Sequence, residues 1–259
     1  MCNNDLNTEK TIYVVGIGPG AQEKMTREAF ETLEKCDVIV GYTVYIDLLR
    51  PSFPKKEFAS TPMRQEIERC KMCLDLALSG KKVALVCSGD AGVYGMAAPL
   101  FELREKNALY AGVHISVVPG VTAANSGAAL LGAPLNNDYC VISLSDLLTP
   151  WEQIEKRLKA VVAGDFAVAL YNPASHRRPD YLRRACHILL DAGANAQTPC
   201  GYVQNIGRTD ENTVICTLSE LMNAEVNMFT TVFIGNSQTR VCADSSGGAR
   251  LVTKRGYDI

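Results

Sequence analysis

A short apolar strand that runs into a glycine-containing loop constrains the fold of this chain more than any other stretch. Residues 83–86, Val-Ala-Leu-Val, have the composition of a buried strand, and residues 93–101 can return as a helix. The loop between them reads Ser-Gly-Asp-Ala-Gly, over residues 88–92. Two glycines at the carboxyl end of a strand let the backbone turn sharply and approach a ligand. The pattern predicts a ligand-binding loop, although a tight turn capped by Asp90 would have the same sequence.

Length and charge limit the classes of protein to consider. The chain has 259 residues, 47% of them hydrophobic, which is enough for one large domain or two of ordinary size. A formal net charge of −2 indicates no general attraction to nucleic acid or to an anionic membrane, so any anion site must be local. No apolar run reaches the roughly 20 residues that a membrane span needs, and residues 1–10 are polar rather than signal-like. We therefore expect a cytoplasmic protein with neither a nucleic-acid nor a membrane partner.

The cysteines favour buried thiols over a metal site. Ten cysteines are scattered along the chain, and only Cys70 and Cys73 form a Cys-x-x-Cys pair, without a second pair at zinc spacing and with only three histidines. We therefore expect no metal. Five apolar positions at helical spacing after Arg64 would bury both cysteines on one helix face, namely Ile67, Cys70, Cys73, Leu74 and Ala77.

A second glycine loop follows the first expected strand, residues 11–17. Gly16-Ile-Gly-Pro-Gly20 leads into a helix pattern over residues 25–36. The spacing Gly16-x-Gly18-x-x-Ala21 also satisfies the dinucleotide-binding fingerprint, so a nicotinamide- or flavin-dependent oxidoreductase must be weighed.

Two features disfavour a dinucleotide site. Such a site needs an acidic residue at the end of the next strand, to hold the ribose. Here the next strand, residues 38–40, ends in Gly41-Tyr42, while Asp37 precedes that strand and so lies at its wrong end. Pro19 also removes one backbone N–H from the loop that would face a pyrophosphate.

Two other segments of the first half are each open to two interpretations. Tyr42 and Tyr45 lie amid apolar residues, before an expected proline-containing loop to Thr61, and could be ordinary core or the wall of a cleft for a flat aromatic ligand. Residues 121–131 are rich in small side chains. They could form a helix that approaches a ligand closely or one that is tightly packed and buried.

The expected domain boundary lies in residues 132–138, where periodicity stops and breaker residues gather. We therefore predict an N-terminal α/β domain over residues 1–135 and a C-terminal α/β domain over 136–259. In the second half, strands are expected at 140–144, 166–171, 201–204, 213–216 and 230–234, and helices at 151–163, 177–192 and 218–224. Several of these strands end in small polar residues, and ligands bind at such edges in open α/β sheets.

An arginine cluster follows the strand expected at residues 166–171. Arg177, Arg178, Arg183 and Arg184 lie near His176, after Tyr171-Asn-Pro. The cluster could bind a polycarboxylate substrate through charge-assisted hydrogen bonds, or it could be a solvated helix face.

Six short motifs follow one another along the chain. They are Gly16-Ile-Gly-Pro-Gly20, Gly41-Tyr42 with Tyr45-Ile-Asp-Leu-Leu49, Ser88-Gly-Asp-Ala-Gly-Val-Tyr-Gly-Met96, Pro119-Gly-Val-Thr-Ala-Ala124, Leu170-Tyr-Asn-Pro-Ala-Ser175 and Phe229-Thr-Thr-Val-Phe-Ile-Gly-Asn-Ser-Gln-Thr239. Each is weak alone, but together and in this order they resemble the motifs of the tetrapyrrole methylases, and most nearly those of the group that methylates carbon 17 of precorrin-3B. The central Gly89-Asp90-Ala91-Gly92, where many sister enzymes have Gly-Asp-Pro, is typical of the carbon-17 group.

The resemblance implies a two-domain α/β fold that holds S-adenosylmethionine in a cleft between the domains, and a homodimer. It implies a methyltransferase of cobalamin biosynthesis that acts on carbon 17 of precorrin-3B, or of its cobalt-containing counterpart, and contracts the ring. Methylation of another precorrin carbon or of RNA remains an alternative within the family, although the near-neutral charge and the absence of a basic stripe disfavour RNA. A dinucleotide-dependent oxidoreductase and a non-catalytic cofactor-binding protein are the alternatives outside it.

The resemblance also implies site residues, by motif position. The cofactor would contact Gly89, Asp90, Ala91, Val93, Thr122, Ala123, Tyr171, Asn205, Ile206, Thr230 and Thr231. The tetrapyrrole would contact Pro19, Gly20, Asp47, Arg64, Tyr94 and Asn172, and the arginine cluster adds Arg177 and Arg178. Ring contraction needs proton transfers, for which the titratable candidates are Asp47, Asp90, Tyr94 and His176.

Overall fold

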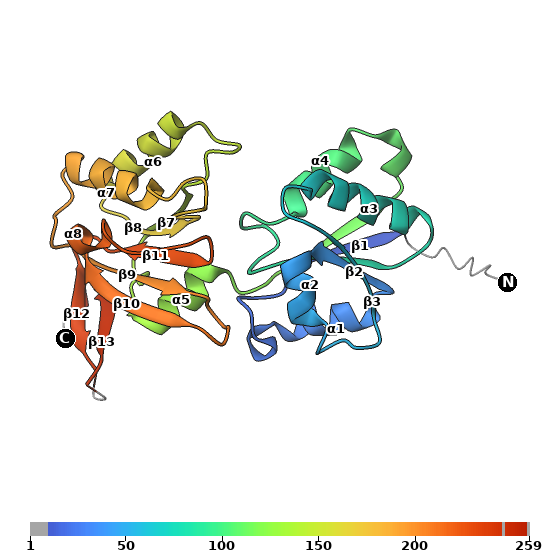
Figure 1. The fold of residues 1–259 in the computed structure, drawn as a ribbon, viewed down its shortest axis with the longest axis horizontal. Coiled ribbons are helices and arrows are strands. Elements are labelled where there is room, and N and C mark those ends of the chain that lie inside the picture. The colour runs from blue at the N-terminus through green and yellow to red at the C-terminus, as the bar shows by residue number, and fades with distance from the viewer. Residues whose placement is uncertain (1–9, 245–246, 258–259) are drawn as a thin grey trace. The chain divides into compact units, whose positions relative to one another are not determined.

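The chain folds into two compact units, one ending at Thr122 and the other beginning at Ala123. A computed structural model describes residues 10–244 and 247–257. Each unit has a five-stranded sheet with helices packed on it, which confirms the predicted α/β class (Figure 1). Residues 1–9, most of the segment expected to be polar rather than signal-like, lie outside the described residues.

The division between the units falls earlier than the boundary predicted after residue 135. Helix α5 (Ala123–Leu131) belongs to the second unit because its buried face packs against that unit's sheet. Ala124, Ala128 and Leu131 share a core cluster with Val203 and Phe233 of that sheet. Because α5 packs on the second sheet, the second unit begins at Ala123, before the loss of periodicity at residues 132–138 on which the predicted boundary is based.

The first unit has a fully parallel sheet in the order β3-β2-β4-β1-β5. Strands β4 and β1 are neighbours, with Gly16 level with Cys87, so the loops that follow them start side by side. Its strands are β1 (Thr11–Gly16), β2 (Val38–Tyr42), β3 (Glu57–Thr61), β4 (Val83–Cys87) and β5 (His114–Val118). Its helices are η1 (Gln22–Lys24), α1 (Arg27–Lys35), α2 (Thr43–Leu49), α3 (Glu66–Leu78), α4 (Ala97–Glu105) and η2 (Ala108–Tyr110).

Both faces of this parallel sheet are buried. Helices α3 and α4 cover one face and α1 and α2 the other (Figure 1). Along the strands, Val14 and Leu85 pack in the cluster of α3 and α4, whereas Val15 and Val86 pack in that of α1 and α2. Burial on both sides explains why β1 and β4 read as almost continuous apolar runs.

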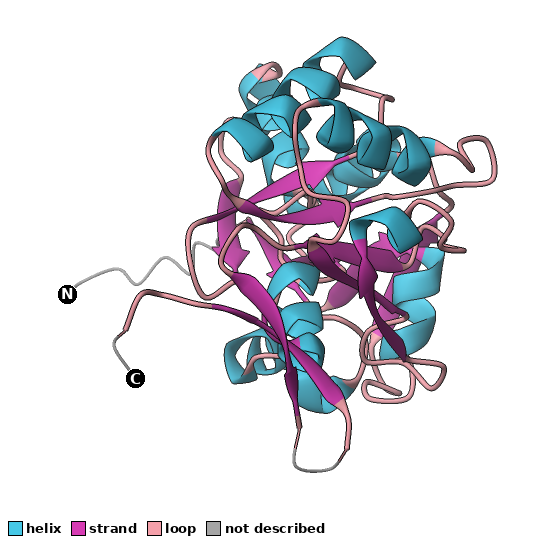
Figure 2. Ribbon diagram, turned by 90° about the vertical axis from the view of Figure 1, so that its left-hand side faces the viewer, coloured by secondary structure: helices cyan, strands magenta, loops and turns pink. Residues whose placement is uncertain are grey.

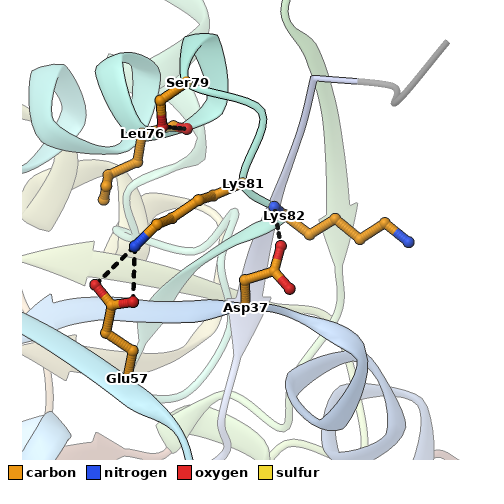
Figure 3. A network of polar contacts seen from close by, with 6 residues as sticks. All are labelled: Asp37, Glu57, Leu76, Ser79, Lys81 and Lys82. Carbon is orange, nitrogen blue, oxygen red and sulfur yellow. Dashed lines mark hydrogen bonds and ion pairs between the residues drawn. The ribbon is translucent and has the colours of Figure 1, made fainter.

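The amino-terminal edge of the same sheet is held by polar contacts (Figure 3). The carboxylate of Asp37 accepts the backbone N–H of Lys82 (2.7 Å), and the ammonium of Lys81 pairs with Glu57 (2.7 Å). Asp37 therefore lies at the start of β2, at the edge opposite the glycine loops, as its position in the sequence predicts. It cannot hold a ribose at the carboxyl edge.

The second unit has a mixed sheet in the order β10-β9-β11-β8-β7, in which β11 runs antiparallel to both neighbours. Helices α6, α7 and α8 pack on one face and α5 on the other, and Figure 2 shows this layering of helices (cyan) and strands (magenta). The strands are β7 (Tyr139–Ser143), β8 (Ala167–Tyr171), β9 (Pro199–Gln204), β10 (Asn212–Thr217) and β11 (Thr230–Ile234). The helices, besides α5, are α6 (Trp151–Ala163), α7 (Tyr181–Asp191) and α8 (Leu218–Leu221).

Four strands lie where the sequence does not predict them. Residues 57–61, expected to be loop, form β3, and the expected linker contains β6 (Gly132–Ala133). Strand β6 pairs with β13 (Ala249–Thr253), which pairs with β12 (Thr239–Ala243) in a small third sheet. Strands β3, β6 and β12 lie at sheet edges, where only one neighbour is needed and apolar alternation is weak.

Two helices start four residues later than expected, and one apolar position is not buried. Helix α4 begins at Ala97 rather than 93, because Tyr94 adopts a left-handed conformation (φ 55°) in the preceding loop. Helix α7 begins at Tyr181, after a turn in which the backbones of Ser175 and Arg178 pair. Ile67, placed by its spacing on the buried face of α3, is 46% exposed.

Candidate functional site

The two glycine loops of the first unit are joined by backbone hydrogen bonds. Gly18 donates its N–H to the carbonyl of Gly89 (3.0 Å), and Gly89 donates to the carbonyl of Gly18 (2.7 Å). The loop after β5 closes against both, because a Cβ on Gly120 would lie 2.1 Å from the carbonyl oxygen of Gly89. A Cβ on Gly16 would likewise lie 2.7 Å from the nitrogen of Gly120. The carboxyl ends of three strands therefore meet backbone to backbone, with no room for side chains.

Asp90 connects these loops through its carboxylate. Oδ1 accepts the N–H groups of Gly92 (2.8 Å) and Val93 (3.1 Å), and Oδ2 accepts that of Gly120 (2.9 Å). The turn interpretation of Asp90 is therefore correct, but it caps a loop rather than helix α4, which starts at Ala97. Hydrogen bonds from amides to a carboxylate are among the stronger ones in proteins.

The first glycine loop departs from the geometry of a dinucleotide site. In that motif the loop opens directly into a helix whose N-terminus faces the pyrophosphate. Here α1 begins only at Arg27, with Thr26 as its N-cap, and the N–H of Gly18 is bonded to Gly89. The glycine spacing of the dinucleotide fingerprint is therefore present, but the helix N-terminus that would bind the pyrophosphate does not directly follow it.

A pocket of about 190 Å³ lies beside the second glycine loop. Tyr42 and Tyr45 form part of its wall, with their rings edge to face and 5.2 Å between centroids. Both tyrosines therefore form a cleft wall, and Tyr45 also packs against the core cluster of α1 and α2. The lining residues are Tyr42, Tyr45, Met63, Glu66, Arg69, Val86, Cys87, Ser88, Tyr94, Gly95 and Met96.

The expected substrate residues that belong to the first unit are dispersed over it. Tyr94 lines the pocket and is 57% exposed. Asp47 and Arg64 are also exposed but do not line it, and Asp47 lies 3.5 Å from Nε of Arg50. Pro19 is buried and Gly20 half-buried, directly after the bridge between the glycine loops.

In the second unit, Tyr171 joins the end of β8 to the first turn of α5. Its hydroxyl oxygen accepts the N–H of Ala124 (2.8 Å), next to Ala123, which opens the helix. Two of the expected cofactor residues, Ala123 and Tyr171, are therefore neighbours in space although far apart in sequence. Thr122 directly precedes the helix.

The other expected cofactor residues lie at the same edge of the second sheet. Thr230 is level with Gln204, so Asn205 and Ile206, which follow β9, are close to the start of β11. Thr230, Thr231 and Ile206 are buried. Because β11 is antiparallel to β8 and β9, its amino end meets their carboxyl ends, which brings all these residues to one edge.

Helix α5 is tightly packed on this sheet. A Cβ on Gly127 would lie 2.8 Å from the ring of Phe233 and 3.1 Å from Cδ1 of Ile206. The packing interpretation of the small-residue segment therefore holds along the inner face of α5.

The arginine cluster is only partly available to a ligand. Nε of Arg178 lies 2.5 Å from Oδ1 of Asp146, whose other oxygen accepts the hydroxyl of Tyr181. The hydrogen bond from Tyr181, with Arg178 nearby, lowers the pKa of Asp146, and the same bond raises the pKa of Tyr181. Arg177 and His176 are exposed.

Left-handed backbone conformations gather at the expected site residues. In the described part of the chain, five residues other than glycine have positive φ, and four of them are predicted site residues. Such conformations cost free energy and often occur where function requires them. The four are Arg64 (φ 69°), Tyr94 (55°), Asn172 (54°) and Asn205 (52°).

Six of the nine cysteines in the described ranges are buried, and these include the pair whose helical spacing predicts burial. Cys70 and Cys73 are fully buried on α3, and burial raises the pKa of Cys70 to about 12. Burial raises the pKa of Cys87, beside the pocket, to about 11. Within the described ranges, no three side chains of the metal-ligating types form a group that could hold a metal ion.

Arg69 is a pocket residue that the sequence reasoning missed. It lies on α3 with only 4% of its surface exposed. A signal was present, because Arg69, Cys73 and Ala77 recur every four residues and so share the buried helix face. Arginine is rarely buried in proteins, so an arginine in line with buried positions indicates a candidate binding residue.

Comparison with known proteins identifies relatives along nearly the whole chain. Residues 11–222 match the family model of the tetrapyrrole (corrin/porphyrin) methylases. A probable cobalt-factor III C(17)-methyltransferase of Salmonella typhimurium is 44% identical, over 96% of this chain and 100% of its own. The precorrin-3B C(17)-methyltransferase of a Sinorhizobium species is 38% identical, over 95% and 97%.

Solved structures have the same fold. The crystal structure of the methyltransferase CobJ superposes with a TM-score of 0.87 at 34% identity, covering 94% of this chain and 99% of its own. A uroporphyrin-III C-methyl transferase from Thermus thermophilus, complexed with S-adenyl homocysteine, has a TM-score of 0.67 at 21% identity, covering 87% and 97%. At that identity the second likeness concerns the fold alone.

Proposed function

The chain belongs to the tetrapyrrole (corrin/porphyrin) methylases, and we propose that it methylates carbon 17 of precorrin-3B, or of cobalt-factor III, in cobalamin biosynthesis. The methyl donor in this proposal is S-adenosylmethionine, and the reaction contracts the ring. The observation that carries the proposal is that two relatives matched along nearly their whole length are both named for a reaction at carbon 17. The joined glycine loops of the first unit support it.

The loop after β4 suits a cofactor that is recognised through the protein backbone. A Cβ on Gly92 would meet nothing nearer than Oδ1 of Asp90 at 3.4 Å, so this side of the loop is open. Asp90 holds the turn rigid through Gly92, Val93 and Gly120. We assign Gly89, Ala91 and Val93 to cofactor contacts, with Asp90 as the residue that positions them.

S-adenosylmethionine, when bound, supplies an electrophilic methyl group on a sulfonium sulfur. Methyl transfer disperses that positive charge in the transition state, so a dry surface of small side chains and carbonyls favours it. Positioning contributes much of the rate, because effective molarities of oriented reactants reach about 10⁵ M or more. In the second unit, the expected contacts are Ala123, Tyr171, Asn205, Ile206, Thr230 and Thr231; Thr122 lies just before them.

The proton transfers of ring contraction need a titratable group that faces the substrate. Asp90 is the least suited of the four candidates, because its two oxygens already accept three backbone N–H groups. Tyr94 is the best placed, because it is exposed and lines the pocket. Asp47 and His176 are exposed and remain candidates.

The reaction is tested by incubating the enzyme with precorrin-3B or cobalt-factor III and methyl-labelled S-adenosylmethionine, followed by NMR of the product. We expect label at carbon 17 and loss of carbon 20 from the macrocycle. Label at another ring carbon would establish the alternative within the family. Calorimetry with S-adenosylhomocysteine and NAD tests the oxidoreductase alternative, because only the former should bind.

A homodimer and a cytoplasmic location are further proposals. The family resemblance supports the dimer. The nine cysteines in the described ranges are all free, which suits a reducing compartment. No helix in the described part of the chain is long and apolar enough to cross a membrane. Sedimentation analysis and cell fractionation test the two proposals separately.

A further inference from the structure

Arg69 is a buried cation with only neutral partners. Nε donates to the hydroxyl of Thr61 (2.9 Å), and Nη2 to the carbonyls of Thr61 (3.5 Å) and Pro62 (3.1 Å). Nη1 contacts the sulfur of Met96 at 3.8 Å, a weak acceptor. Among the described ion pairs, none brings a carboxylate within 4.0 Å of this guanidinium.

This arrangement is incomplete in energetic terms. Arginine keeps its charge at all ordinary pH values, and a buried charge costs free energy unless it is paired and fully hydrogen-bonded. The carbonyls and the hydroxyl orient the guanidinium without neutralising it. Nη1, which has only the thioether as partner, retains donor capacity for a stronger acceptor.

The pocket at Arg69 is open to a ligand of matching charge. Arg69 is its only lining cation, and burial keeps the neighbouring Cys87 thiol neutral, with a pKa of about 11. Glu66 is the one lining carboxylate; it is exposed and accepts the N–H of Arg64 (3.3 Å). At about 190 Å³ the pocket is smaller than the usual site of a whole drug-sized ligand, so it suits a carboxylate-bearing arm of a larger molecule.

We propose that Arg69 binds a carboxylate of a ligand in this pocket and so anchors that ligand beside the glycine loop. The inference rests on the proposed methyltransferase function, which offers two sources of that group. One is a carboxylate side chain of the tetrapyrrole, and the other is the methionine carboxylate of the cofactor. The same pocket is lined by Ser88 of the glycine loop and by Met96, which is close to the proposed cofactor site. It is also lined by the rings of Tyr42 and Tyr45, which suit a flat tetrapyrrole. Either ligand could therefore place a carboxylate beside Arg69.

The test compares substitutions at Arg69 that differ in charge and reach. Arg69→Gln keeps a donor for Thr61 or Pro62 but removes the charge, and Arg69→Lys keeps the charge but loses the two-pronged geometry. Exposed Arg27, which pairs with Glu31 on α1, provides the matched control Arg27→Gln. For each variant, the substrate KM and kcat, the Kd of S-adenosylhomocysteine by calorimetry, and the thermal midpoint are measured.

For a tetrapyrrole carboxylate, we expect Arg69→Gln to raise the substrate KM about 10- to 100-fold while the Kd of S-adenosylhomocysteine is unchanged. If Arg69 instead binds the methionine carboxylate of the cofactor, Arg69→Gln should raise the Kd of S-adenosylhomocysteine by a similar factor. Arg69→Lys should lie between wild type and Arg69→Gln in either case. Glu66→Gln should act in the opposite direction and tighten the same ligand, because it removes the only lining carboxylate.

Folding and function are separated as follows. If Arg69→Gln does not fold, Arg69→Lys and Glu66→Gln still give the opposite signs that the proposal requires. Unchanged KM and Kd in a folded Arg69→Gln enzyme would overturn the proposal, with the methylation reaction itself intact. Failure of the wild-type enzyme to methylate either tetrapyrrole would instead overturn the proposed function.

Discussion

Oδ2 of Asp90 accepts the backbone N–H of Gly120 at 2.9 Å, across 30 residues of sequence. This bond joins the loop after β4 to the loop after β5, with the loop after β1 packed between them. One carboxylate thus joins two of the three loops, and the backbone bonds between Gly18 and Gly89 join the third to them. A substitution at Asp90 should therefore act on the whole edge of the sheet.

Asp90→Asn should destabilise the protein by about 1–3 kcal/mol, because one acceptor oxygen becomes an amide donor facing another N–H. Urea unfolding measures the loss. S-adenosylhomocysteine affinity should fall as well, since the loop no longer holds its conformation. If the Asp90→Asn variant had the stability and the S-adenosylhomocysteine affinity of the wild type, the three hydrogen bonds of Asp90 would not be what organises the loop.

Gly120→Ala should disrupt the same edge for steric reasons. Its Cβ would lie 2.1 Å from the carbonyl oxygen of Gly89, and backbone cannot move aside as a flexible side chain can. We expect a destabilisation of about 1–3 kcal/mol or more. Gly112→Ala is the control, because nothing lies within 4 Å of its Cβ. Equal melting temperatures for the two variants would contradict the packing described.

Gly92→Val separates binding from folding. The open side of Gly92 accommodates a Cβ, so the thermal midpoint without ligand should change little. S-adenosylhomocysteine binding should weaken, because the new side chain occupies the proposed cofactor space. Calorimetry that finds unchanged affinity would remove this side of the loop from the cofactor site.

Arg177→Ala and Arg178→Ala should have different effects. Arg177 is exposed, so its loss should raise the substrate KM about tenfold if it meets a substrate carboxylate. Arg178 pairs with Asp146, so its loss should cost about 1 kcal/mol of stability instead. Steady-state kinetics and thermal melts on both variants check this. An unchanged KM for Arg177→Ala would favour the solvated-face interpretation.

Alkaline pH should destabilise the fold through its thiols. Burial raises the pKa of Cys87 to about 11 and of Cys70 to about 12, above the ordinary value near 9. A raised folded-state pKa contributes stability below the unfolded pKa, and this is lost as pH rises through the folded value. The free energy of unfolding should therefore decline between about pH 9 and 12. Cys87→Ser should reduce the slope, and an identical slope would contradict the assignment.

The sequence by itself determined the α/β class, most strands and the positions of both glycine loops. These follow from local patterns, because a buried parallel strand must be apolar on both faces and a sharp turn at its end needs glycine. Residues 83–86 and the start of α6 at Trp151 illustrate how closely such patterns predict elements. The burial of Cys70 and Cys73 also follows from spacing alone.

Tertiary structure alone decided what depends on distant partners. Strand β6 exists because β13 pairs with it, and α5 belongs to the second unit because Gly127 fits against Phe233. The bond from Gly120 to Asp90 has no local signature in the sequence. Arg69 is the clearest case. Its position in α3 marks it as unusual, but only the folded chain shows that Thr61 and Pro62 hold its guanidinium at the wall of a pocket. Among the described ion pairs, none places a carboxylate within 4.0 Å of that guanidinium.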